Sequence, residues 1–241
     1  MTHFVLIHGA WHTGEHWAPV AKRLEQLGHK VTAPTVLGPG KGVDKNVTHA
    51  QQIADLVNQI TKADLKDFVL AGHSYGGTII SRLAEEIPDR IRRLVFWNAF
   101  VPLPGNSLDD ETPPHYRALF KQLSDASADR TVTMPFPIWR EAFMNDADEA
   151  LAKSAYETLS SEPYQPLIDK LDLKRFYETK IPKSYLNCTE DIALPPGEWG
   201  WHPRMSSRLG LYRLVQMPGS HEVLFTNPVG LADKLVEAGR D

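Results

Sequence analysis

Ala71-Gly72-His73-Ser74-Tyr75-Gly76-Gly77 joins a short apolar run at 68–71 to a segment with helical periodicity at 79–87. Its middle fits the pattern Gly-x-Ser-x-Gly, in which a serine stands in a sharp turn between a strand and a helix. Bulky side chains two positions away would collide with such a turn, and glycines at 72 and 76 remove them. The helix start also offers backbone N–H groups and a positive dipole end to an oxyanion. We therefore predict that Ser74 is a catalytic nucleophile that attacks an acyl group.

The sequence on both sides of this turn alternates between strand-like and helix-like segments. Short apolar runs are typical of strands buried on both faces of a parallel sheet, and they predict strands at 4–7, 30–33, 68–71, 94–97, 183–188 and 211–217. Apolar residues at helical spacing predict helices at about 17–24, 48–60, 79–87 and 228–238. Parallel neighbours need a crossover connection, so this alternation implies βαβ units. The predicted fold class is α/β, with a mostly parallel sheet flanked by helices.

The alternation breaks between about 101 and 180. Pro, Asp, Ser and isolated aromatic residues alternate there with short helical stretches at 139–145 and 151–159. We interpret this segment as a helical cap insertion over a core formed by 1–100 and 181–241. Because α/β chains of this length commonly form one core, a single domain spanning 1–241 is expected.

A serine hydroxyl is a weak nucleophile, so it needs a base within reach and a carboxylate that orients the base. His221 lies in the loop after the last predicted strand, where its imidazole can turn back over the sheet edge. Asp191 follows the strand at 183–188, and its short side chain suits a tight loop, although Glu190 is an adjacent competitor. Asp109 and Asp110 could also serve, but they lie close to the cap and are disfavoured.

An oxyanion hole needs two N–H donors that point at one place. One donor is expected in the residue after the nucleophile, and the other in the loop after the first strand. That loop reads His8-Gly9-Ala10-Trp11. The N–H groups of Ala10 and Tyr75 are therefore the predicted donors.

Composition and charge exclude several classes of function. The net charge is −4 and the basic residues are scattered, so the electrostatic footprint of a nucleic-acid-binding protein is missing. The single cysteine, Cys188, cannot supply a Cys-rich metal site, and no metal site is predicted. The N-terminal apolar run is far shorter than a signal peptide or a membrane span needs, so we expect no membrane partner and a cytoplasmic location.

Four stretches carry a resemblance to a known family: HFVLIHGA at 3–10, GHKVTA at 28–33, GHSYGG at 72–77 and CTED at 188–191. They resemble the α/β-hydrolase group that contains plant methyl salicylate esterases, hydroxynitrile lyases and bacterial esterases of similar size. The similarity covers about two-thirds of the chain and fades in the cap. It implies an α/β-hydrolase fold, a triad of Ser74, Asp191 and His221, an oxyanion hole from Ala10 and Tyr75, and no cofactor.

Two positions distinguish an esterase from a lyase within this group. The lyases carry a threonine where this sequence has Gly9, and a lysine that handles cyanide where it has Glu222. A carboxylate beside the site disfavours a cyanide leaving group, whereas ester hydrolysis needs only the triad, the oxyanion donors and water. The sequence therefore favours an esterase.

Apolar and aromatic side chains in or near the cap predict a pocket for a small substrate. The candidate substrate-binding residues are Trp11, Phe100, Trp139, Phe143, Met144 and Trp199; the alternative is that they form the cap's own core. The expected function is a serine carboxylesterase for small, aromatic or apolar esters, with a homodimer as a possible assembly. A hydroxynitrile lyase, a lactonase, a C–C hydrolase and a non-catalytic small-molecule receptor are the alternatives.

Overall fold

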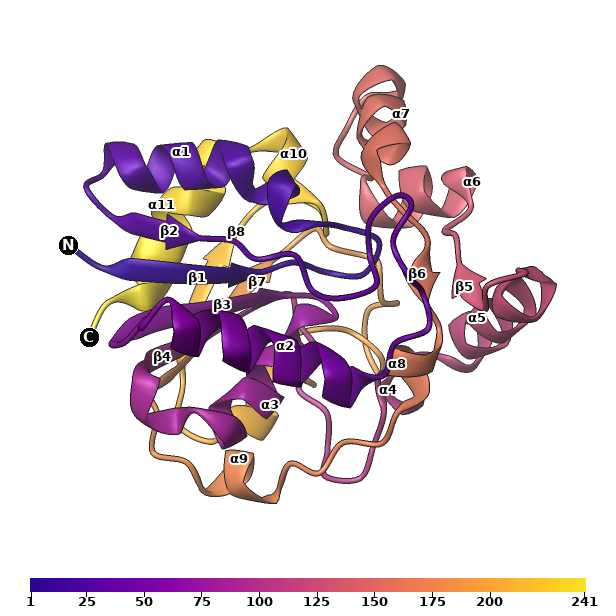
Figure 1. Ribbon diagram of the computed structural model, residues 1–241. Helices are drawn as coiled ribbons and strands as arrows, with labels where there is room; N and C mark the ends of the chain where they lie inside the picture. Colours follow the sequence, from indigo (N-terminus) through magenta and orange to yellow (C-terminus); the bar gives the residue numbers. More distant parts are fainter.

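A six-stranded sheet forms the centre of the computed structural model, which describes residues 1–241 (Figure 1). The strand order is β2-β1-β3-β4-β7-β8, and all neighbouring strands are parallel. After β1, the chain adds β2 along one edge of β1 and then β3 along the other edge. The strand order therefore reverses between β1 and β3. The strands are β1(His3–Ile7), β2(Lys30–Thr32), β3(Phe68–His73), β4(Ile91–Trp97), β7(Lys183–Cys188) and β8(Arg213–Met217). The predicted parallel sheet is confirmed.

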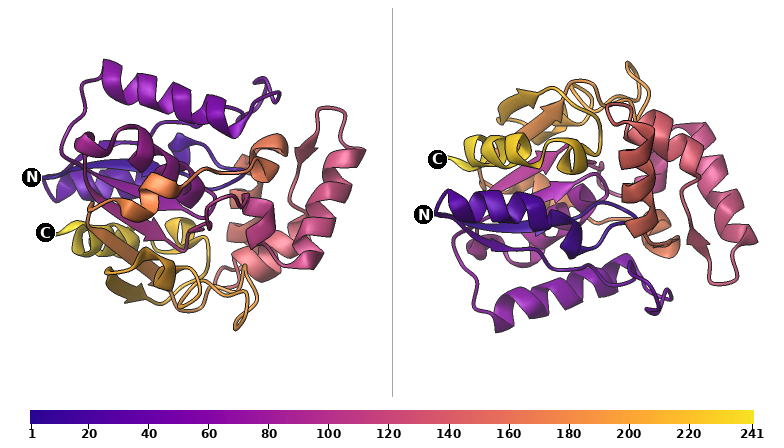
Figure 2. Two further views of the ribbon diagram at one scale, coloured as in Figure 1. Left: turned by 90° about the horizontal axis from the view of Figure 1, so that it is seen from below. Right: turned by 90° about the horizontal axis from the view of Figure 1, so that it is seen from above.

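Helices cover both faces of this sheet, as the continuous apolar strands require. In β1, Phe4 and Leu6 pack on the face of α1(Ala18–Gln26) and α11(Pro228–Gly239). Val5 and Ile7 point to the opposite face, under α2(His49–Lys62) and α3(Gly76–Glu86). Figure 2 shows α1 and α11 side by side when the molecule is seen from above. The predicted arrangement of helices on the two faces is confirmed.

The ends of these helices follow local sequence signals. Thr48 caps α2 by accepting the N–H of Gln51, and the Gln51 side chain accepts the N–H of Thr48. Gly28 takes a positive φ of 83° just after α1, and Pro88 follows α3. None of the helices has the length and apolar content needed to cross a bilayer.

Most of the segment between β4 and β7 lies beyond the carboxyl ends of the strands, on the right in Figure 1, while its last helix, α9, packs beside α3. It contains an antiparallel pair, β5–β6, which the sequence analysis does not predict because two-residue strands show no period. The elements of this segment are α4(Leu108–Glu111), α5(Pro114–Ala126), β5(Thr131–Val132), α6(Phe136–Ile138), the π-helix η3(Trp139–Phe143), α7(Glu149–Thr158), β6(Glu162–Pro163), α8(Gln165–Ile168) and α9(Lys174–Glu178). Short elements elsewhere are η1(Gly14–Trp17), η2(Pro88–Arg90), η4(Ser206–Leu209) and α10(Val223–Thr226).

Two buried histidines are held in the neutral form. His8 Nδ1 lies 2.8 Å from the carbonyl oxygen of Gly9, and its Nε2 accepts the N–H of Val36 at 3.0 Å, so only one ring nitrogen carries a proton. His49 is buried under α3, where its Nε2 contacts the Thr78 hydroxyl at 3.1 Å. Burial lowers the pKa of each histidine from 6.5 to about 3.

These histidines predict a loss of stability in mild acid. The unfolded chain binds protons at both sites below its ordinary pKa of 6.5, whereas the folded chain does so only near pH 3, so the free energy of unfolding falls as the pH drops between these values. Urea denaturation near pH 7 and near pH 5 measures this fall. We expect a smaller fall in His49→Gln than in the wild type. The same fall in both proteins would contradict the role given to His49.

Candidate active site

Ser74 stands in a strained turn between β3 and α3. Its φ is 52°, in the left-handed region that residues with a side chain rarely adopt. The surrounding backbone is packed so tightly that no side chain fits at three nearby positions. A Cβ on Gly72 would lie 2.6 Å from the Gly76 carbonyl oxygen, and one on Gly77 would lie 2.1 Å from that of Phe100. A Cβ on Gly76 would meet two carbonyl oxygens of the β1 end at 2.8 Å. The glycines therefore let the serine project from the sheet edge.

His221 and Asp191 form a buried pair at the same edge of the sheet. The imidazole Nδ1 lies 2.6 Å from the Asp191 Oδ2, and both side chains are almost completely buried. Two further donors fix the carboxylate: the side-chain amide of Asn98 donates to Oδ2, and the N–H of Ala193 donates to Oδ1 at 2.8 Å. The other ring nitrogen, His221 Nε2, has no hydrogen-bond partner. The pair therefore presents a free imidazole nitrogen that a carboxylate orients.

The competing carboxylates are engaged elsewhere. Glu190 accepts the N–H of Gly219 at 3.1 Å. Asp110 accepts hydrogen bonds from Ser107 and from the Lys170 ammonium. Asp109 lies 3.8 Å from the guanidinium of Arg117. None of the three is paired with His221.

The N–H groups of Ala10 and Tyr75 have no acceptor within the chain. Ala10 lies in the loop after β1, Tyr75 lies at the start of α3, and both line the cavity that contains Ser74. Two unpaired donors beside one serine are the feature that an oxyanion hole needs.

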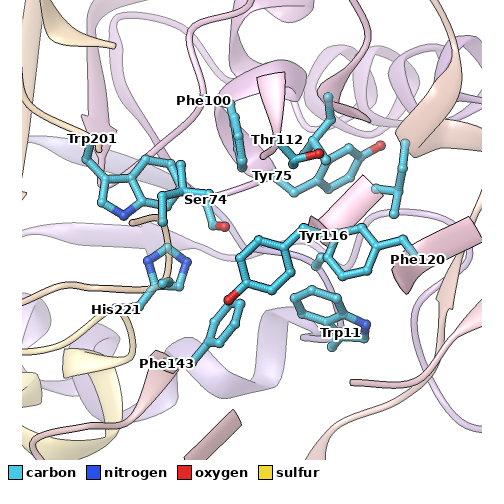
Figure 3. A pocket seen from close by; sticks show the side chains of 15 residues that line it. Trp11, Ser74, Tyr75, Phe100, Thr112, Tyr116, Phe120, Phe143, Trp201 and His221 are labelled. Carbon is cyan, nitrogen blue, oxygen red and sulfur yellow. The ribbon is translucent and has the colours of Figure 1, made fainter. Parts of the chain in front are cut away.

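Ser74 and His221 face a cavity of predominantly apolar character (Figure 3). Twelve of its fifteen lining residues are hydrophobic, so the cavity suits an uncharged ligand. The lining residues are Ala10, Trp11, Ser74, Tyr75, Phe100, Leu108, Thr112, Tyr116, Phe120, Phe143, Leu167, Ala193, Leu194, Trp201 and His221.

Three of the six predicted substrate-binding residues line this cavity, namely Trp11, Phe100 and Phe143. The other three do not, and the prediction for them is corrected. Trp139 and Met144 are completely buried in the core that joins the cap to the sheet, and the Trp139 indole N–H donates to the carbonyl of Ala152. Trp199 lies under the guanidinium of Arg204, 5.0 Å from its carbon.

Trp201 takes the place that was predicted for Trp199. Its indole lies parallel to the His221 imidazole, at a centroid distance of 5.0 Å and an interplanar angle of 13°. Both tryptophans stand in the same loop after β7, two residues apart, and nothing in the sequence indicates which one turns inward. Only the folded loop separates them.

Asn98 is a site residue that sequence reasoning missed. Its side-chain Nδ2 donates to Asp191, and its side-chain Oδ1 accepts the N–H of Cys188 at 2.6 Å, so it ties the end of β4 to the end of β7. A sequence signal was present, because a polar residue directly follows a buried strand. Residues in that position gather at the carboxyl edge of a parallel sheet.

Three possible metal ligands also meet here. Ligand atoms of His73, His221 and Glu222 lie within 4.8 Å of one another. Each side chain already contacts a neighbour: His73 Nε2 bonds the His221 carbonyl, His221 Nδ1 bonds Asp191, and Glu222 lies 3.1 Å from His12. Hydrogen bonding within the chain accounts for this cluster.

Comparisons with known proteins agree with this geometry. The sequence model of the Alpha/beta hydrolase family matches residues 4–234. The carbendazim hydrolyzing esterase of Nocardioides sp. (strain SG-4G) is 31% identical over 99% of this chain and 100% of the esterase. Methylesterase 2 of Arabidopsis thaliana is 36% identical over 97% of this chain and 94% of the methylesterase.

A solved structure is closely similar as well. It is an extracellular alpha/beta-hydrolase from a Paenibacillus species, described as sharing structural and functional homology with tobacco salicylic acid binding protein 2. It matches with 46% identity and a TM-score of 0.98, over 100% of both chains. The resemblance and the fold predicted from the sequence are confirmed, and this chain belongs to the alpha/beta hydrolase family.

Proposed function

We propose that this chain is a serine carboxylesterase in which Ser74, His221 and Asp191 form the triad. One observation carries the proposal: the imidazole of His221 is held by Asp191 at 2.6 Å on one side, while its Nε2 is free and its ring faces the cavity with Ser74. A base oriented in this way at the same cavity as a serine hydroxyl is the arrangement that acyl transfer requires.

The proposed reaction has two halves. Ser74 Oγ attacks the ester carbonyl carbon while His221 Nε2 takes the hydroxyl proton, and the carbonyl oxygen becomes an oxyanion bound by the N–H groups of Ala10 and Tyr75. The carbon–oxygen bond to the alcohol then breaks, and His221 gives its proton to the leaving alcohol. Water attacks the acyl-enzyme with His221 again as the base, which releases the acid and restores Ser74.

The cavity supports small esters with an aromatic or apolar acyl or alcohol group. Aromatic rings of Trp11, Phe120, Phe143 and Trp201 surround Ser74. Burial, followed by the nearby Asp191 carboxylate, raises the pKa of Tyr116 to about 12, so its phenol adds no charge at neutral pH. The relatives named as a carbendazim hydrolyzing esterase and a methylesterase support the choice of an ester substrate.

Hydrolysis is favoured over hydroxynitrile lysis, although an alpha-hydroxynitrile lyase is among the relatives. No lysine or arginine lines the cavity, so there is no cation to receive cyanide. A Cβ on Gly9 would lie 3.0 Å from His73 Nδ1 and 3.1 Å from Ser74 Cβ, so a threonine there would push against the side chains of His73 and Ser74. The sequence analysis expected the Glu222 carboxylate to stand beside the reacting groups. Glu222 is instead buried against His12 and does not line the cavity.

The alternative functions, the location and the assembly state that the sequence suggests stay predictions. The intact set of Ser74, His221 and Asp191 favours catalysis over a receptor role. Lactone and C–C hydrolysis use the same groups, and a substrate panel distinguishes them. The cytoplasmic location and the homodimer stay predictions, and the Paenibacillus relative is described as extracellular.

Ser74→Ala tests the nucleophile. We expect hydrolysis of short-chain p-nitrophenyl esters to fall by about 10⁶-fold in kcat, because the attacking hydroxyl is gone. A spectrophotometric assay of the wild type and the variant measures this loss. Wild-type turnover in the variant would refute the assignment.

Asp191→Asn and Glu190→Gln test the acid. The first variant removes the charge that orients His221, so we expect kcat to fall by about 10⁴-fold. The second variant keeps an oxygen that accepts the Gly219 N–H and should retain activity near the wild type. The reverse pattern would assign the role to Glu190.

Trp201→Leu and Trp199→Leu test the corrected lining of the cavity. Removing the indole beside His221 should lower kcat/KM for an aromatic ester by about ten- to a hundredfold. Trp199 lies outside the cavity, so its variant should keep the wild-type value. Steady-state kinetics with phenyl acetate gives both numbers, and equal effects would contradict the placement.

A further inference from the structure

The loop that carries one oxyanion donor is held in a strained conformation. Trp11, the residue after Ala10, has a φ of 66° although it is not a glycine. A bulky residue in this region is strained and persists only where the surroundings fix it. The contacts that fix this loop therefore determine where the Ala10 N–H points.

The peptide group that carries the Ala10 N–H is hydrogen-bonded at its carbonyl end. The Ala10 N–H belongs to the peptide whose carbonyl is that of Gly9, and this carbonyl accepts the Nδ1–H of His8 at 2.8 Å. The next peptide, between Ala10 and Trp11, is bound at both ends. Its orientation fixes the rotation of the chain at Ala10.

Glu162 binds the N–H end of the Ala10–Trp11 peptide. Its Oε2 accepts the N–H of Trp11 at 2.8 Å, although Glu162 lies on β6, 151 residues away along the chain. The Glu162 side chain is completely buried, and burial raises its pKa to about 8. The N–H of Ser160 also donates to the Trp11 carbonyl at 3.0 Å. The cap therefore holds this loop through hydrogen bonds with two residues, Ser160 and Glu162.

His12 binds the carbonyl end of the same peptide. Its Nδ1 lies 2.7 Å from the Ala10 carbonyl oxygen, which can only accept, so Nδ1 carries a proton. Its Nε2 lies 3.1 Å from the Glu222 carboxylate in a pair that is buried on both sides. Burial lowers the pKa of His12, but the Glu222 charge and hydrogen bonds to Glu222 and Ala10 more than offset this and raise the pKa above its ordinary value.

Glu222 also connects this loop to the catalytic base. It directly follows His221, and the carbonyl of His221 accepts a hydrogen bond from His73, the residue before Ser74, at 3.0 Å. The oxyanion loop, the serine turn and the histidine loop are thus joined behind the cavity by the rings of His12 and His73.

We propose that Glu162 and Glu222 are positioning residues for the oxyanion hole. Glu162 acts on the Trp11 N–H, and Glu222 acts through His12 on the Ala10 carbonyl, so that together they aim the Ala10 N–H at the reacting oxygen. This inference rests on the proposed function of Ala10 as an oxyanion donor.

Leucine and glutamine variants at both positions test the proposal. Glu162→Leu and Glu222→Leu remove the contacts in a similar volume. Glu162→Gln keeps an oxygen for the Trp11 N–H, and Glu222→Gln can donate its amide N–H to a neutral His12. Glu85→Leu is a matched control, because Glu85 is also a buried acid that accepts a backbone N–H, that of Phe176 at 2.8 Å, away from the cavity.

Two readouts separate positioning from a structural role. The first is the rate at which a fluorophosphonate labels Ser74, which requires the oxyanion hole but no ester substrate. The second is kcat and KM for p-nitrophenyl acetate, with thermal unfolding as the check on folding. We expect both leucine variants to lose about 10²-fold in labelling rate and in kcat, with KM near the wild-type value. The glutamine variants should retain most of both.

Wild-type labelling rates in folded leucine variants would overturn the proposal, and so would an equal loss in Glu85→Leu. If a leucine variant does not fold, Glu162→Asp or Glu222→Asp decides instead, because aspartate withdraws the carboxylate by one methylene and should cause the same loss. Absence of ester turnover in the wild type would count against the carboxylesterase function alone, since labelling still reports the reactivity of Ser74.

Discussion

The close approach of backbone to backbone around Ser74 is the constraint on which the rest of the site depends. The first turn of α3 packs directly against the ends of β1 and β3 and against the loop after β4, at distances where a side chain does not fit. This contact forces Ser74 into a left-handed conformation and turns its side chain toward the cavity. It also places Tyr75 and the loop after β1 at the same cavity. The proposed nucleophile and both proposed donors therefore depend on glycines that perform no chemistry themselves.

Local signals explain why the core of this arrangement could be predicted from the sequence. Strands buried on both faces leave uninterrupted apolar runs, and a nucleophile in a tight turn leaves its glycines close beside it. His221 and Asp191 could be identified because each follows a strand, and parallel strands end at one edge of a sheet. Between the adjacent acids, the short side chain and the family resemblance favoured Asp191 over Glu190, and the folded loop pairs Asp191 with His221.

The cavity lining was predictable only in part, for a physical reason. Trp139 and Phe143 lie four residues apart on one short helix and are almost equally buried, at 0% and 6% exposure, yet only Phe143 faces Ser74. Apolar side chains are recruited to a core and to a cavity by the same loss of contact with water, so hydrophobicity does not separate them. The contact between Trp11 and Glu162 was equally hidden, because a buried glutamate in an isolated two-residue strand has no periodicity to reveal it.

That contact has a consequence for how the molecule divides into parts. Residues 1–100 contain the proposed nucleophile and both proposed oxyanion donors, and they resemble a self-sufficient module. The groups that hold the donor loop, however, come from Ser160, Glu162 and Glu222, far along the chain. A cap exchanged between relatives would therefore bring more than a new lining for the cavity. It would also replace part of the scaffold behind the oxyanion hole. An exchange of caps would therefore change the substrate range and the catalytic rate at the same time.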